Sequence, residues 1–316
     1  MSDIDATRMY QPLTDEEDKA RTNVHYLLPA RFFEVLTGGA WHTYSANVWQ
    51  AFERADPADP QQQTAAQAAK LDRFAQLLEL KPGARVLDVG AGWGGPLIYL
   101  CTRYGVKGHG LMLSEEQLRY ARAWAERAGA DCTFEVKHWN QFEAAPGSFD
   151  AVMTDEVIVH FFRLGDFFGK AFGWLRDEGL MVNKELHFVH PALGHTLLPA
   201  VQRVNALYGG TANYRSLGDE LKLANDAGFA VEQVVELPPR DYHLSAEAWR
   251  RNLRAHEAEL TALVGAERYR EYVLYVSMVS LTHAEGVKHR QQVLHFVQCR
   301  KWSAAARKPW SFGPGL

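Results

Sequence analysis

The central part of the chain alternates between short apolar runs and longer amphipathic stretches. The apolar runs have the length and composition of buried β-strands, and they cover residues 85–89, 106–113, 132–136, 149–153 and 179–187. Helical patterns at 115–128 and 167–175 lie between them, and Ser114 is suited to cap the first of these helices. Strands that alternate with helices in this way predict an α/β fold with a mostly parallel, doubly wound sheet.

The alternation fails on both sides of this central part. Residues 64–80 predict an amphipathic helix after a polar loop at 56–63, and residues 242–284 are mostly helical. A helix at 217–227 and strands at 231–237 and 291–299 complete the pattern. We therefore expect a flexible N-terminus at 1–22, a helical segment at 23–80 that covers the ligand, a Rossmann-like core at 81–300 with helical lid insertions near 191–216 and 238–286, and a flexible tail at 303–316.

The first strand of the core runs into a glycine-rich turn, and residues 85–96 read RVLDVGAGWGGP. Glycine permits a sharp turn and lets a ligand lie against the main chain. Residues 90–95 satisfy G-x-G-x-x-G, but a dinucleotide enzyme usually ends its second strand with an acidic residue. Here that strand ends at Leu113, and the carboxylate lies inside the first strand as Asp88. This arrangement favours S-adenosylmethionine (SAM) over a nicotinamide cofactor.

Composition narrows the class of protein further. The 316 residues carry a net charge of −4 with both signs mixed, which gives no support for a nucleic-acid partner. No apolar run reaches the ~18 residues of a membrane span, so no integral membrane contact is expected. The acidic N-terminus does not resemble a secretory signal, and we interpret the three scattered cysteines as reduced thiols. We therefore expect a cytoplasmic protein, with the oligomeric state, a homo-oligomer included, left open.

Ligands of doubly wound sheets bind outside the carboxyl ends of the strands. Five segments follow the ends of the predicted strands, at residues 90–93, 113–114, 139–140, 154–160 and 184–187. We expect them to converge on one crevice. No metal site is expected there, because His187 and His190 are three apart on a strand and face opposite sides.

The order of the motifs resembles the cyclopropane-fatty-acid synthase family, which includes the mycolic-acid cyclopropane synthases and their methyltransferase relatives. The resemblance spans roughly residues 22–300, and its markers are NVHY at 23–26, Tyr-Ser at 44–45 with Trp49, the turn region 79–95, GLMLSEEQ at 110–117, HWNQF at 138–142 and His-Pro at 190–191. It implies the class I SAM-methyltransferase fold with SAM as cofactor. The residues that we expect to contact SAM are Tyr44, Ser45, Asp88, Gly90, Ala91, Gly92, Leu113, Ser114, Gln117, Trp139, Asn140 and Thr154.

The resemblance also marks a departure. Cyclopropane synthases hold a bicarbonate ion with a Cys, a Glu, a His and a Tyr, and this ion removes a proton so that the ring can close. The matching positions here are Ala46, Val159, Lys184 and Tyr242, so only the tyrosine remains. The resemblance therefore implies that the SAM half of the family site is kept and that the acceptor half is changed.

Four residues are candidates for the catalytic work. Glu156 follows the fourth strand, where the methyl group would lie, and is the candidate base. His160 and Tyr242 match family positions. Lys184 could pair with Glu156 or bind an anionic group of the substrate, whereas Glu185, the next residue on the strand, should face away.

These observations predict a SAM-dependent methyltransferase that methylates a carbon of a small or medium apolar metabolite, such as an isoprenoid or another natural-product precursor. Basic residues at 240–254 could meet an anionic group on that substrate, although a solvated helix face explains them as well. Three alternatives stay open: a cyclopropane or methyl-branching lipid enzyme whose base has moved to Glu156, a small-molecule N-methyltransferase, and a SAM-binding protein without activity.

Overall fold

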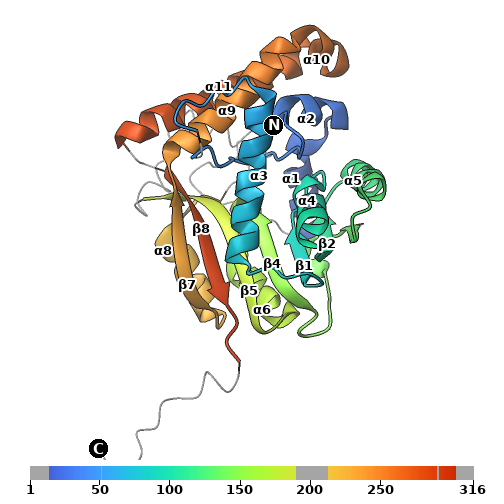
Figure 1. Cartoon of the computed structure of the whole chain (residues 1–316), viewed down its shortest axis with the longest axis vertical. Helices are drawn as coiled ribbons and strands as arrows, with labels where there is room; N and C mark the ends of the chain where they lie inside the picture. The colour runs from blue at the N-terminus through green and yellow to red at the C-terminus, as the bar shows by residue number, and fades with distance from the viewer. Residues whose placement is uncertain (1–13, 51, 190–212, 290–291, 304–316) are drawn as a thin grey trace, which may run out of the picture.

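A mixed sheet of eight strands forms the centre of the computed structural model, which describes residues 14–50, 52–189, 213–289 and 292–303 (Figure 1). The strand order is β3-β2-β1-β4-β5-β8-β7, with β6 beside β5. The strands are β1 (Arg85–Val89), β2 (Lys107–Met112), β3 (Cys132–Val136), β4 (Phe149–Asp155), β5 (Leu175–Phe188), β6 (Arg215–Ser216), β7 (Ala230–Leu237) and β8 (Gln292–Arg300). β1 to β5 pair in parallel, and β8 runs antiparallel to β5 and β7. The prediction of a mostly parallel α/β sheet is confirmed.

Helices cover both faces of the sheet and one of its ends. Those that alternate with the strands are α4 (Gly95–Tyr104), α5 (Glu115–Ala128), α6 (Leu164–Trp174) and α8 (Leu217–Asp226), with short 3₁₀ turns η1 (Trp139–Gln141) and η2 (Ile158–His160). The N-terminal helices are α1 (Asp15–Tyr26), α2 (Ala30–Thr37) and α3 (Pro60–Leu77). The C-terminal insertion comprises α9 (Pro239–Ala255), α10 (Glu257–Val264) and α11 (Ala266–His289), and α9 packs against both α11 and α2 at one end of the molecule (Figure 1). None of the described helices has the length and apolar composition needed to span a membrane.

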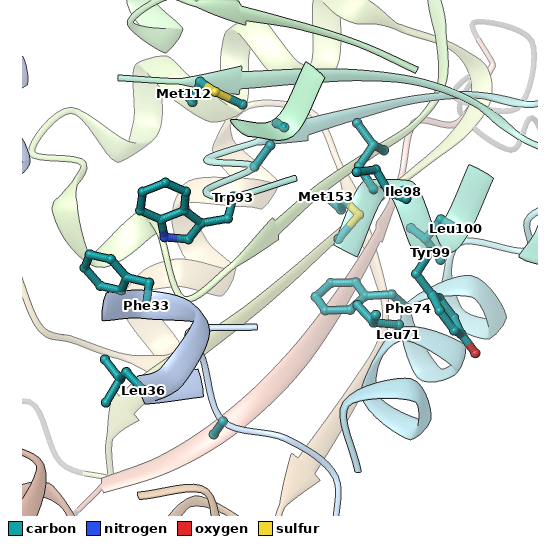
Figure 2. Close-up of a cluster of buried hydrophobic side chains, with 14 of the residues drawn as sticks. Phe33, Leu36, Leu71, Phe74, Trp93, Ile98, Tyr99, Leu100, Met112 and Met153 are labelled. Carbon is teal, nitrogen blue, oxygen red and sulfur yellow. The ribbon is translucent and has the colours of Figure 1, made fainter. Parts of the chain in front are cut away.

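The alternation of side chains along the strands divides the core into two layers. Val86 packs with α3 and α4, and its neighbour Leu87 packs with the aromatic residues of α6 on the other face. Figure 2 shows the first layer, in which Leu71 and Phe74 of α3 lie close to Ile98 of α4. Because side chains alternate, Asp88 faces the same side as Val86, toward the N-terminal helices.

Two expectations for the N-terminal part are wrong. Residues 15–22, expected to be flexible, belong to α1, whose first turn is capped by the Thr14 hydroxyl. The expected loop at 56–63 ends early, because Asp59 caps α3 and Pro60 begins it, a position that suits proline. Residues 1–13, the expected insertion up to residue 212, and the tail from residue 304 lie outside the described residues.

The close approach of Gly95 to the loop before α3 gives a test of the fold. A Cβ at Gly95 would lie 1.9 Å from the Trp41 carbonyl oxygen, so Gly95→Ala should force the glycine turn and the loop apart. We expect a loss of about 1–3 kcal/mol of unfolding free energy together with weaker binding of SAM. The control is Gly169→Ala on α6, where nothing lies within 4 Å of the new Cβ and stability should be kept or slightly raised. Urea denaturation of the two variants measures this, and equal stabilities would contradict the account.

Candidate active site

A cavity of about 1110 Å³ of empty space opens beside the glycine turn, at the carboxyl ends of the parallel strands. Its size and mixed lining are typical of a small-molecule site. Nine of the twelve residues expected at a SAM site line it: Tyr44, Ser45, Asp88, Gly90, Ala91, Gly92, Leu113, Gln117 and Trp139. The strand ends therefore converge as the sheet topology predicts.

The other three expected residues do not line this cavity. The Ser114 hydroxyl accepts from the Gln117 amide as the N-cap of α5. The Thr154 side chain is fully buried and donates to Asn183 Oδ1 at 2.9 Å. The Asn140 amide donates to Asp15 at 3.0 Å and so fixes α1 rather than a ligand.

The glycine turn owes its shape to two close contacts. Gly90 has φ +89°, and a Cβ on it would lie 2.5 Å from the Val157 side chain. The amides of Gly90 and Ala91 both donate to the Leu111 carbonyl, at 3.0 and 2.9 Å. Both amides therefore stabilise the turn itself. At Gly92 a Cβ would meet only the Gly90 carbonyl, at 4.0 Å, so the turn is open on the side of Gly92.

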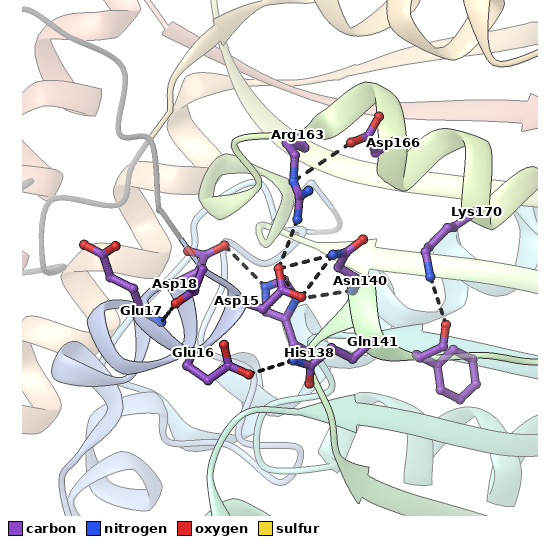
Figure 3. Close-up of polar contacts among 12 residues, drawn as sticks. Asp15, Glu16, Glu17, Asp18, His138, Asn140, Gln141, Arg163, Asp166 and Lys170 are labelled. Carbon is purple, nitrogen blue, oxygen red and sulfur yellow. Dashed lines mark hydrogen bonds and ion pairs between the residues drawn. The ribbon is translucent and has the colours of Figure 1, made fainter.

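Helix α1 forms one wall of the cavity. Figure 3 shows that Asp15 and Asp18 of α1 face His138, with Arg163 and Asn140 also directed at Asp15. His138 Nε2 lies 3.3 Å from Asp18, and Arg163 lies 3.0 Å from Asp15. Asp18 Oδ1 and Trp139 Nε1 have no hydrogen-bond partner within the described part of the chain, and both side chains line the cavity. The Asp18 oxygen could therefore accept a hydrogen bond from a cofactor, and the Trp139 nitrogen could donate one.

A second cavity, of about 940 Å³, adjoins the first and reaches toward α9 and α11. Four residues line both cavities: Tyr26, Tyr44, Glu156 and His160. The remaining lining includes four aromatic side chains, Tyr214, Tyr242, Trp249 and Tyr275, together with aliphatic and polar residues. Glu156 and His160 therefore lie at the boundary where a group would pass from one cavity to the other.

The Glu156 carboxylate is fixed at this boundary by its neighbours. Its Oε1 accepts from the Ala46 amide at 2.7 Å and from Lys184 Nζ. Burial raises the pKa of Tyr242 well above its usual value, and the Glu156 carboxylate, with which its hydroxyl interacts, raises it further. Ala46, Lys184 and Tyr242 are three of the four positions that the family resemblance assigns to the ligands of the bicarbonate ion. The Glu156 carboxylate therefore contacts residues at the positions that, by the resemblance, hold the bicarbonate ion in cyclopropane synthases.

Glu156 also has an unusual backbone. Its φ is +55°, which is uncommon for a residue with a Cβ, and its amide donates to the Lys184 carbonyl at 2.7 Å. Strained backbone of this kind concentrates at functional sites, where the surrounding structure maintains it.

A buried ionic network lies beneath Glu156. Asp155 accepts from the Ser45 hydroxyl at 2.6 Å and pairs with Lys70 at 2.6 Å and with Lys184 at 3.0 Å. Burial opposes the ionisation of Asp155, but Lys184 and Lys70 outweigh it and lower its pKa to about 2. Burial also lowers the pKa of Lys184, but Asp155 and Glu156 outweigh this effect, so its pKa stays above the usual value.

Sequence reasoning missed Lys70 and Asp155. Lys70 is fully buried although it lies on α3, and burial lowers its pKa to about 8 against the opposing effect of Asp155. The sequence pattern does indicate that Lys70 is buried, because Lys70 lies four residues before Phe74 and hence on the apolar face of the predicted helix. Asp88, on the same side of the sheet, has its pKa raised to about 8, by burial first and by Asp155 second.

Glu185 does not face away from the crevice as expected, because it lines the second cavity. Its carboxyl group accepts from the amides of Leu186 at 2.8 Å and of Val159 at 3.0 Å. Burial raises the pKa of Glu185 to about 8, and the charge of Glu156 adds to this effect. The second cavity thus contains a carboxyl group that keeps its proton at neutral pH.

The raised pKa of Glu185 predicts how stability depends on pH. Between the unfolded pKa of ~4.3 and the folded value of about 8, the folded state binds one more proton, so stability falls as pH rises. One proton corresponds to a slope of about 1.4 kcal/mol per pH unit. Glu185→Gln should lose this part of the slope in urea denaturation at pH 6, 7 and 8, and Glu126→Gln on the exposed face of α5 should keep it. Identical slopes for wild type and Glu185→Gln would show that the carboxyl group is ionised in the folded state.

Comparisons with known proteins match most of the chain to one family. The family model described as mycolic acid cyclopropane synthetase matches residues 14–293. Methoxy mycolic acid synthase MmaA3 of Mycobacterium tuberculosis is 28% identical over 282 residues, which cover 82% of this chain and 90% of that protein. A 24-methylenesterol C-methyltransferase 2 of Oryza sativa subsp. japonica is 35% identical over 176 residues, 53% of this chain and 48% of that protein.

The fold is shared with solved structures of the same family. Mycolic acid cyclopropane synthase CmaA1, complexed with S-adenosylhomocysteine (SAH) and CTAB, matches with a TM-score of 0.78 at 23% identity, over 92% of this chain and 99% of that chain. The class I SAM-methyltransferase fold predicted from the sequence is thereby confirmed. The chain belongs to the mycolic acid cyclopropane synthetase family and is a SAM-dependent methyltransferase.

Proposed function

We propose that the enzyme transfers the methyl group of SAM to a carbon of a double bond in a small or medium apolar metabolite, with Glu156 as the base that completes the reaction. The observation that carries this proposal is the position of the Glu156 carboxylate, which lines both cavities at their boundary. SAM would occupy the cavity beside the glycine turn, and the acceptor would occupy the second cavity. The name of the sterol C-methyltransferase relative supports methylation at carbon.

The reaction requires a base at the boundary between the two cavities. The π electrons of the double bond attack the methyl carbon, the bond from carbon to sulfur breaks, and the neighbouring carbon is left as a cation. A base must then remove a proton from a carbon next to the cation so that the electron pair forms a new double bond. Glu156 is held in place by Ala46 and Lys184 and can take that proton. Tyr26 and Tyr44 line both cavities beside it, and aromatic rings of this kind can stabilise a cation.

The second cavity fits an apolar acceptor better than an anionic one. Among the described residues that line it, none is a lysine or an arginine. Lys184 lies behind Glu156 and is already paired with Glu156 and Asp155. Two arginines of α9 are engaged elsewhere, since Arg240 donates to the Phe52 carbonyl and Arg250 pairs with Glu247. The proposal therefore places no anionic group of the acceptor near the reacting carbon.

One alternative gains support from the same geometry. Glu156 lies among three of the positions that the resemblance assigns to the bicarbonate ligands, so it could also remove a proton from the newly transferred methyl group. That step would close a cyclopropane ring. A cyclopropane or methyl-branching enzyme with Glu156 as its base is therefore the second candidate, and NMR of the product distinguishes a ring from a methyl or methylene group.

Removal of the carboxylate tests the proposal. Glu156→Gln should lower methyl transfer by about 10²- to 10⁴-fold, whereas its affinity for SAM should change only a few-fold. The assay uses SAM with a labelled methyl group and a panel of prenyl alcohols, sterols and unsaturated fatty acyl compounds. Glu126→Gln, on the surface of α5, is the control and should match wild type.

Chemical rescue tests the same role of Glu156 by a gain of activity. Glu156→Gly removes the carboxylate and leaves Ala46, Lys184 and Tyr242 in place, so added formate or bicarbonate should restore part of the activity. Full activity of Glu156→Gln would disprove the role of Glu156 as base. Binding of SAM without transfer to any acceptor by the wild-type protein would favour a SAM-binding protein instead.

A further inference from the structure

His283 on α11 is a buried polar residue that the methyl-transfer chemistry does not use. Only 5% of it is exposed, and it lines the second cavity. Its ring lies edge-on to Tyr242, with ring centroids 4.0 Å apart at an angle of 80°. Tyr242 also interacts with Glu156, so it lies between His283 and the boundary of the two cavities.

The hydrogen bonding of His283 determines which of its nitrogen atoms is available. Its Nδ1 lies 2.8 Å from the Val279 carbonyl oxygen, one helical turn earlier. A carbonyl oxygen can only accept, so Nδ1 must carry the hydrogen. Burial lowers the pKa of His283 to about 4, and the ring is therefore neutral near pH 7. Nε2 is then a hydrogen-bond acceptor, and within the described part of the chain it has no partner.

A buried acceptor without a partner is unfavourable unless a ligand satisfies it. The two carboxyl groups of this cavity, Glu156 and Glu185, are already engaged by backbone amides. We propose that His283 is a specificity-determining residue whose Nε2 accepts a hydrogen bond from a hydroxyl or amine group of the acceptor substrate. The inference rests on the proposed function in one respect, namely that the second cavity holds the acceptor.

The position of His283 indicates how it would act. Tyr242 separates it from Glu156, so the donor group of the substrate lies away from the reacting carbon. Such a contact aligns the acceptor without taking part in proton removal. A substrate whose donor is missing leaves Nε2 unpaired, and sites of this type bind such analogues more weakly. His283 is thus a positioning residue, and its loss should raise KM more than it lowers kcat.

Binding of matched probes to the SAH-loaded enzyme tests the inference. Farnesol, farnesylamine and farnesyl methyl ether share one apolar tail, but only the first two can donate a hydrogen bond. We expect the two donors to bind about 10-fold more tightly than the ether, which corresponds to ~1.4 kcal/mol, in titrations followed by tryptophan fluorescence. Farnesylamine is an ammonium ion near pH 7, so the comparison of the two uncharged probes, farnesol and the ether, is the decisive one.

Variants assign this preference to His283. His283→Phe should bind all three probes as weakly as wild type binds the ether, and His283→Gln, whose side-chain oxygen can accept, should regain part of the preference. His256→Phe, on the exposed turn between α9 and α10, is the matched control. The affinity for SAH should not change in any of them. For a probe that is methylated, His283→Phe should raise KM and change kcat only a few-fold.

Three outcomes would overturn the inference: equal binding of alcohol and ether by wild type, a preference that survives in His283→Phe, or no binding of any probe. The first of these needs no variant, so it decides the matter even if His283→Phe does not fold. Failure of the proposed function has a different signature. In that case the probes bind with the expected preference, but neither they nor the acceptor panel receive a methyl group.

Discussion

The structure of the site depends on the burial of two lysines next to two carboxylates. Lys70 and Lys184 are both completely buried, and Asp155 bridges them, with Glu156 on the far side of Lys184. Charges in such surroundings are tolerated only when they are paired and hydrogen-bonded. The network joins α3, β4 and β5, and it fixes the Glu156 carboxylate between the two cavities. Removal of Asp155 would leave Lys70 without its carboxylate partner in the interior.

This network explains why several positions differ together from the cyclopropane synthase pattern. A protein carboxylate that takes the place of a bound anion needs a cation and a donor in reach. Lys184 supplies the cation, the Ala46 amide supplies the donor, and the tyrosine at 242 is kept. Val159, at the position of the lost glutamate, lines the second cavity instead. The replacements are therefore consistent with one change, from a bound anion to a built-in base.

The sequence predicted the sheet and most of the cofactor cavity because both depend on local patterns. Strand periodicity and the glycine turn lie within short segments, and a parallel topology brings the carboxyl ends of the strands to one crevice. Tyr214 and His283 could not be placed in this way, because they reach the site from the segment before β6 and from α11, far from the cofactor motifs along the chain. Asn140 shows the opposite error, since a polar residue beside the cofactor loop contacts α1 instead. Alternation along β5, with Lys184 assigned to the crevice, predicts that Glu185 faces away, but Glu185 lines the second cavity.

If Glu156 is the base, as proposed, methyl transfer needs no bound bicarbonate. The most direct measurement is the rate of methyl transfer in buffer freed of carbon dioxide, compared with the same buffer after bicarbonate is added. Because Glu156 occupies the position between Ala46, Lys184 and Tyr242, we expect equal rates with and without bicarbonate. A rate that falls when bicarbonate is removed and recovers when it is returned would contradict the account.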